Sequence, residues 1–100
     1  MYDMKNLSKV KALGELAPDA VKAFWAFDKA AFADGAIPLK YKELMAVALA
    51  LTTQCPYCIE DHAARARKAG ATEPKLAEAS MVAAAMRAGA GVAHATHVVR

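Results

Sequence analysis

Residues 43–62 read ELMAVALALTTQCPYCIEDH, and this stretch decides the fold. Its first half is apolar on every side of a helix, a pattern typical of a buried central helix. The apolar run stops near Thr53 and Gln54, and the Cys55-Pro56 step then opens a second helix, with Pro56 in its first turn and Cys55 as its N-cap. We therefore expect an antiparallel helical hairpin that turns near Gln54.

The composition of the whole chain favours the same class of structure. Its 100 residues are 57% hydrophobic and include 26 alanines, and alanine is the best helix former and is depleted from strands. Five glycines and four prolines are too few for a collagen-like or proline-rich disordered chain. A chain of this length makes one domain, so we predict a single all-α domain over residues 1–100.

Proline and glycine divide the chain into about six helical segments. The expected segments are residues 4–16, 18–33, 38–53, 55–70 and 72–88, followed after Gly89 and Gly91 by a short stretch that holds His94 and His97. The second segment, with Phe24, Trp25 and Phe32, is expected to supply most of the aromatic core. Because alanine-rich helices carry little bulk, we expect part of the apolar surface to be buried between subunits of a homo-oligomer.

Charge and hydropathy argue against several classes of partner. Thirteen basic and ten acidic residues give a net charge of +3, and the basic residues are scattered, so nucleic acid is not indicated. The longest apolar run, residues 44–51, is far below the ~18 residues of a membrane span, and residues 1–10 lack the apolar core of a signal peptide. We expect a cytoplasmic protein with no nucleic-acid partner and no membrane partner.

The two cysteines lie three residues apart at the expected start of a helix. Their Cα atoms would be about 5–6 Å apart, so dithiol and disulfide can interconvert with little backbone movement. In a reducing cytoplasm such a pair is redox-active or metal-binding rather than a structural cross-link. The free N–H groups of a helix start lower a thiol pKa, and this argument alone makes the more exposed N-cap residue, Cys55, the attacking thiol.

His62 and Glu43 complete a possible catalytic constellation. His62 follows Cys58 by four residues, so the two side chains share a helix face and His62 can accept the thiol proton. Glu43 precedes Cys55 by twelve residues, about 18 Å along a continuous helix, so it reaches the site only if the hairpin folds back. It can then orient His62 or relay its proton, directly or through water.

Each of these residues also has a simpler interpretation. The cysteines can form half of a zinc site, although no histidine lies at the spacing of a zinc finger, or they can be inert core residues. His62 alone is typical of a surface or capping histidine, and Glu43 alone of a solvated acid in a first helical turn. The combination of the four residues favours redox chemistry, for which no metal or organic cofactor is required.

Glu43, Cys55, Cys58 and His62, at this spacing, resemble the AhpD-like alkylhydroperoxidase branch of the carboxymuconolactone decarboxylase family. The likeness runs from about residue 32 to residue 79 and includes the Ala-Gly-Ala step at residues 69–71. The resemblance implies an all-helical fold that assembles as trimers or hexamers. It also implies a thiol-dependent peroxidase that reduces hydroperoxides, closes a disulfide, and is restored by a lipoyl- or thioredoxin-like protein reductant.

The resemblance also assigns roles to the four residues. Cys58 would be the peroxidatic thiol, Cys55 the resolving thiol, His62 the base, and Glu43 part of the proton relay. The well-characterised hydroperoxidases of the family carry a histidine between the cysteines where this chain has Tyr57. Two alternatives remain open: a thiol-disulfide sensor without turnover, and a decarboxylase-like lyase. The decarboxylases generally lack the cysteine pair, so its presence argues for redox chemistry.

Overall fold

The computed structural model describes residues 2–100, and every regular element in that range is helical. A short 3-10 helix, η1, precedes five α-helices; the bounds are η1 (Met4–Lys9), α1 (Val10–Leu16), α2 (Pro18–Phe32), α3 (Leu39–Thr53), α4 (Pro56–Lys68) and α5 (Glu73–Ala95). The all-α class is therefore confirmed, with five α-helices in place of the six segments expected. None of these helices is long and apolar enough to cross a membrane.

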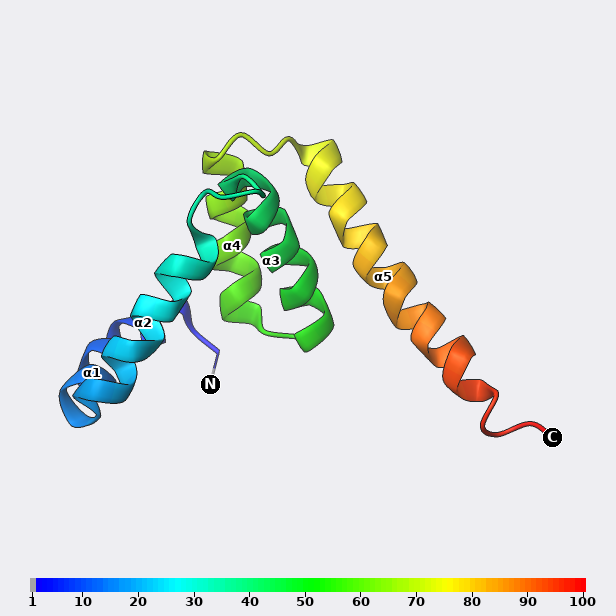
Figure 1. The fold of residues 1–100 in the computed structure, drawn as a ribbon, viewed down its shortest axis with the longest axis horizontal. Helices are drawn as coiled ribbons and strands as arrows, with labels where there is room; N and C mark the ends of the chain where they lie inside the picture. Colours follow the sequence, from blue (N-terminus) through cyan, green and yellow to red (C-terminus); the bar gives the residue numbers. More distant parts are fainter. Residues whose placement is uncertain (1) are drawn as a thin grey trace.

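Helices α3 and α4 form the expected antiparallel hairpin, and they lie side by side at the centre of the molecule (Figure 1). Gln54 ends α3 in the left-handed conformation, with φ 56° and ψ 44°, which turns the chain sharply. The backbone N–H of Cys55 donates to the Ala50 carbonyl at 3.1 Å and satisfies one of the last carbonyls of α3. Pro56 then starts α4, where its missing N–H costs no hydrogen bond.

The buried core lies where the hairpin meets the loop before α5 and the first turns of that helix. Its members are nearly or fully buried aliphatic residues; they are Val47, Ala66, Ala71 and Leu76, with Leu44, Leu51 and Ala63 packed against them. Further along α5, Ala83 is buried against α3, and Arg87 donates from Nη1 to the Thr52 carbonyl at 2.9 Å. Small side chains let these helices approach closely, as expected from the alanine content.

Two helix boundaries differ from the expectation. α5 passes through Gly89 and Gly91 without a break and ends at Ala95, because its alanine neighbours offset the cost of about 1 kcal/mol per glycine. The expected stretch around His94 and His97 is therefore the last turn of α5 and the turn after it. The expected helix over residues 4–16 is divided into η1 and α1.

The expectation of an aromatic core in the second helix is wrong for the single chain. α2 has no buried residue, and Phe24, Trp25 and Phe27 are all about half exposed or more. α1 and α2 pack on each other away from the hairpin, and α5 extends from the other side (Figure 1). The radius of gyration is 16.6 Å, against about 13 Å for a compact domain of this length. The chain is thus open, with much apolar surface uncovered.

The core makes a testable prediction about stability. Leu76 is 7% exposed, so Leu76→Ala should lower the free energy of unfolding by about 2–5 kcal/mol through lost burial and a cavity. Leu16, which is 84% exposed, provides the same substitution outside the core, and Leu16→Ala should change it by less than about 0.5 kcal/mol. Chemical unfolding at matched protein concentration measures both, and equal losses would contradict this placement of the core.

Candidate functional site

Both cysteines lie at the start of α4, as the sequence predicts. Cys55 is the N-cap in an extended conformation, with φ −97° and ψ 101°, and its Sγ accepts the backbone N–H of Cys58 at 3.3 Å. Both residues are partly buried and both are free thiols. A sulfur that replaces the usual capping oxygen lies among donors, which is an environment that favours a thiolate.

The two thiols differ in their tendency to ionise. The pKa of Cys55 is lowered, first because the Cys58 thiol donates to its sulfur, and then because the backbone N–H groups of Cys58 and Tyr57 do so. The pKa of Cys58 is raised to about 11 by that same bond to Cys55, by desolvation, and by repulsion from the neighbouring charge. Cys55 is therefore the first thiol to ionise, which agrees with the helix-start argument rather than with the roles that the resemblance assigns.

Glu43 and His62 meet, as the folded-back hairpin requires. His62 Nδ1 lies 2.7 Å from Glu43 Oε2, although the residues are 19 apart in the chain. Glu43 is only 3% exposed, so it is not the solvated acid of the simpler interpretation. A carboxylate only accepts, so Nδ1 carries the hydrogen and Nε2 is left with the lone pair that a base needs.

His62 follows the cysteines closely in the sequence. Within residues 2–100, however, its ring makes no hydrogen bond to either cysteine sulfur. Four residues separate Cys58 from His62 along one face of α4, a spacing at which side chains are neighbours. The predicted contact of His62 with Glu43 is therefore present, and the predicted proton exchange of His62 with Cys58 stays a prediction.

Phe32 holds the other side of the histidine ring. The two rings are stacked, with centroids 5.2 Å apart and planes at 11°. Lys42 fixes the end of α2 there, because its Nζ donates to the carbonyls of Ala31 at 2.9 Å and Ala33 at 2.5 Å. Phe32 is a site residue that the sequence analysis missed, since it was assigned to the core.

The N-terminal segment contacts the motif from outside the hairpin. Asn6 Nδ2 donates to the Tyr57 hydroxyl at 2.9 Å, and the Tyr2 hydroxyl donates to Glu60 Oε2. The Tyr2 and Tyr57 rings meet edge to face with centroids 4.8 Å apart. The bond to Glu60 raises the pKa of Tyr2 to about 12, so its hydroxyl stays a donor. These contacts hold Tyr57, which lies between the two cysteines in the sequence. No sequence motif predicted them.

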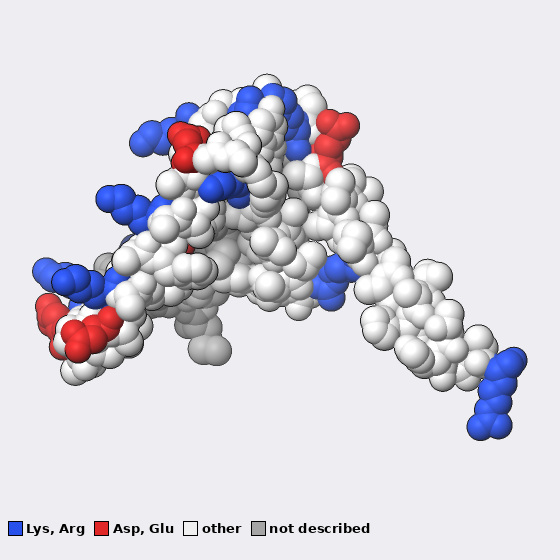
Figure 2. Space-filling model, viewed as in Figure 1, with Lys and Arg blue, Asp and Glu red and all other residues white. Residues whose placement is uncertain are grey.

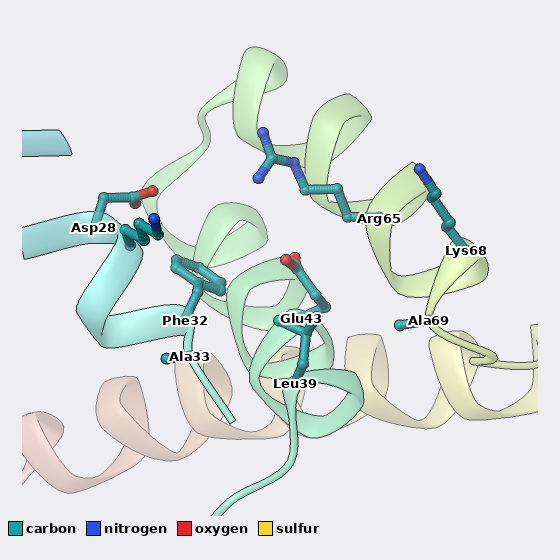
Figure 3. Close-up of a pocket in the computed structure, with 9 residues that line it drawn as sticks. Asp28, Phe32, Ala33, Leu39, Glu43, Arg65, Lys68 and Ala69 are labelled. Carbon is teal, nitrogen blue, oxygen red and sulfur yellow. The ribbon is translucent and has the colours of Figure 1, made fainter. Parts of the chain in front are cut away.

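An open groove of about 790 Å³ adjoins the buried acid (Figure 3). Its walls come from the end of α2, the start of α3 and the end of α4; the lining residues are Asp28, Lys29, Phe32, Ala33, Leu39, Glu43, Arg65, Lys68 and Ala69. The Glu43 carboxylate points into this space, and Phe32 faces it from α2 (Figure 3). The groove therefore ends at the two side chains that contact His62.

Comparison with known proteins identifies the family. The model of the carboxymuconolactone decarboxylase family matches residues 18–100, which include all four candidate residues. The chain belongs to the carboxymuconolactone decarboxylase family. The resemblance drawn from the motif is thereby confirmed, and this family includes AhpD-like peroxidases.

Two bacterial relatives match most of the length of this chain. An uncharacterised protein of the cox locus of Paracoccus denitrificans is 48% identical over 98 residues, covering 95% of this chain and 88% of the relative. An uncharacterised protein of Cupriavidus necator is 40% identical and covers 85% of this chain and 75% of the relative.

Two crystal structures share the fold of this family member. A protein from Methanobacterium thermoautotrophicum has a TM-score of 0.81 at 36% identity, over 86% of this chain and 97% of that one. A carboxymuconolactone decarboxylase family protein from Legionella pneumophila, in its apo form, has a TM-score of 0.78 at 34% identity, over 82% of this chain and 73% of that one.

The two thiols should respond to each other's removal in opposite directions. Cys55→Ala removes the sulfur to which the Cys58 thiol donates, together with its negative charge, so the pKa of Cys58 should fall from about 11 toward that of an ordinary cysteine. Cys58→Ala removes a donor, so the pKa of Cys55 should rise. The pH dependence of iodoacetamide alkylation, followed by intact mass, measures both. The remaining thiol of each variant should approach an ordinary cysteine profile, and a Cys55 or Cys58 profile unchanged from that of the unaltered protein would contradict the coupling.

Proposed function

We propose that this family member is a thiol-dependent peroxidase that reduces hydroperoxides through Cys55 and Cys58. The observation that carries the proposal is the placement of the two thiols at the start of α4, one turn before His62 and its buried partner Glu43. A dithiol supplies the two electrons that a hydroperoxide accepts, and the histidine and acid pair supplies a path for protons.

In the proposed reaction Cys58 attacks as a thiolate. Its proton lies in the hydrogen bond to Cys55, so transfer along that bond places the negative charge on Cys58, on the helix face of His62. The sulfur bonds to one peroxide oxygen, the O–O bond breaks, and the leaving alkoxide takes the proton that His62 Nε2 has first accepted from solvent. The products are a sulfenic acid on Cys58 and an alcohol.

The cycle is completed by Cys55. Its thiol sulfur displaces the hydroxyl of the sulfenic acid and forms the disulfide, and the proton that leaves this thiol joins the departing hydroxide as water. The dithiol has then lost two electrons and the hydroperoxide has become an alcohol and water. A lipoyl- or thioredoxin-like protein with its own dithiol reduces the disulfide by exchange.

The first experiment counts thiols. The reduced protein should lose two thiols and two mass units when one equivalent of an alkyl hydroperoxide is added, and should turn over when a dithiol reductant is present. Cys58→Ser should abolish turnover, whereas Cys55→Ser should still be oxidised once and leave a sulfenic acid that dimedone traps. His62→Ala should slow the first oxidation by roughly 10²–10⁴-fold if the ring is the proton carrier.

Other outcomes identify the alternatives. A single slow oxidation without turnover would make the pair a thiol-disulfide sensor. A sulfenic acid trapped on Cys55 in Cys58→Ser, with none on Cys58 in Cys55→Ser, would exchange the roles of the two thiols. If both thiols stay reduced after hydroperoxide is added, the peroxidase proposal is refuted. Decarboxylase-like lyase activity would then be assayed next.

We also propose that the chain works as a homo-oligomer. Its long α5 is uncharged along its outer length in the view of Figure 2, and the large apolar side chains on it are exposed; they include Met81, Val82, Met86 and Val92. A monomer with this much uncovered apolar surface, and with the open shape described above, is unusual in water. A trimer or hexamer, the assemblies that the family resemblance implies, would cover this face.

If the chain is a homo-oligomer, a charge introduced on the apolar face of α5 should lower the mass of the particle in solution. Met86→Asp places a charge on the apolar face of α5, so it should shift the particle toward the monomer. Ser8→Asp adds the same charge to exposed η1 and should leave the mass unchanged. Light scattering after size exclusion measures both, and a monomeric unaltered protein would refute the assembly.

A further inference from the structure

We propose that the groove beside Glu43 binds amphipathic monocarboxylates, so that medium-chain hydroperoxides bearing a carboxylate are the substrate class of this site. The substrate class rests on the proposed peroxidase function, whereas the carboxylate-binding site rests on the groove alone. Three features of the groove support it: its position, the cations on its rim, and its apolar walls.

The groove runs from Glu43 and Phe32 toward the end of α4. His62, Arg65 and Ala69 follow one another on one face of that helix, at the spacing of a helical row. Opposite them, Leu39 and Glu43 form the same kind of row on antiparallel α3. From His62 to Lys68 the helix rises about 9 Å, so a ligand lying along the groove can span from the catalytic pair to the rim.

Three cations border the groove: Lys29 from α2, and Arg65 and Lys68 from α4. Neither lysine has an ion pair or a hydrogen bond within residues 2–100. Arg65 uses only its Nε, which lies 3.0 Å from Asp61 Oδ2, and its terminal N–H groups remain for a second acceptor. Guanidinium and ammonium groups are the side chains best suited to bind a carboxylate.

The acids around the groove limit the charge of the ligand. Glu43 is buried and held by His62, so it does not compete at the rim. The two acids left near the rim are Asp28, which lines the groove, and Asp61, which forms an ion pair with Arg65. Three cations against these two acids leave one positive charge at the rim, which matches a single carboxylate rather than a polyanion.

The remaining walls are apolar. Phe32 and Leu39, with Ala33 and Ala69, line the space between the cationic rim and the catalytic pair. An alkyl chain gains about 25 cal/mol per Å² of surface that it buries against such walls. A carboxylate at the rim then places the far end of the chain beside Glu43 and Phe32, the two lining side chains that contact His62. A hydroperoxide at that end would approach the proposed site from the side of the Glu43–His62 pair, with Cys58 one helical turn further along α4.

Binding is tested first, without any peroxide. Octanoate and its neutral counterpart octanol are titrated by calorimetry into the reduced full-length protein at low salt. Octanoate should bind at least roughly tenfold more tightly than octanol. Added salt should weaken the binding of octanoate and leave the binding of octanol unchanged. The same difference should hold in Cys58→Ser, because binding does not need the thiol.

Variants locate the site. Lys68→Gln and Lys29→Gln should each lower the affinity for octanoate by about 3- to 10-fold, as expected for partly exposed ion pairs. Neither should change the affinity for octanol. Lys22→Gln is the matched control, since Lys22 is an exposed lysine on α2 that does not line the groove. Equal affinity for octanoate and octanol, or an equal effect of all three variants, would overturn the proposal.

Turnover then separates the two proposals. A medium-chain hydroperoxide with a terminal carboxylate should show a lower KM than its methyl ester, and Lys68→Gln should reduce this difference by about 3- to 10-fold. Turnover without this preference would refute the substrate class and leave the peroxidase standing. Octanoate binding without turnover of any hydroperoxide would support the site and refute the peroxidase.

Discussion

Antiparallel packing of α3 on α4 is the constraint on which the rest of the structure depends. The left-handed turn at Gln54 reverses the chain in two residues and so fixes the register of the two helices. That register brings Glu43 to His62 and places both cysteines at the start of a helix. A buried carboxylate without a partner would be costly, so the bond to His62 also stabilises the hairpin that creates it.

Local signals made this centre predictable. The apolar run, the Cys55-Pro56 helix start and the twelve-residue spacing from Glu43 are all written within 20 consecutive residues, and the hairpin follows from them. The continuation of α5 through Gly89 and Gly91 was missed because glycine weakens a helix by less than its alanine neighbours support it. The exposure of Phe24 and Trp25 was missed because periodicity identifies an apolar face but not what covers it.

The thiols show how local chemistry and family likeness can differ. The helix start and the donors around Cys55 make it the easier thiol to ionise, while the shared face with His62 belongs to Cys58. The hydrogen bond between the sulfurs links these two facts, because it lets one negative charge be held by either atom. Acidity and nucleophilic role therefore need not reside on the same cysteine, and no pattern of residue types can separate them.

The N-terminal segment shapes the surroundings of the cysteines from outside the region that matches the family. Tyr2 and Asn6 touch Tyr57 and Glu60 beside the cysteines, yet both lie before residue 18, where the match to the family begins. The region that matches the family model thus carries Glu43, both cysteines and His62, and a stretch outside that region contacts the residues beside the cysteines. Substitutions at Tyr2 or Asn6 would change the surroundings of the two thiols without touching the helices that hold them.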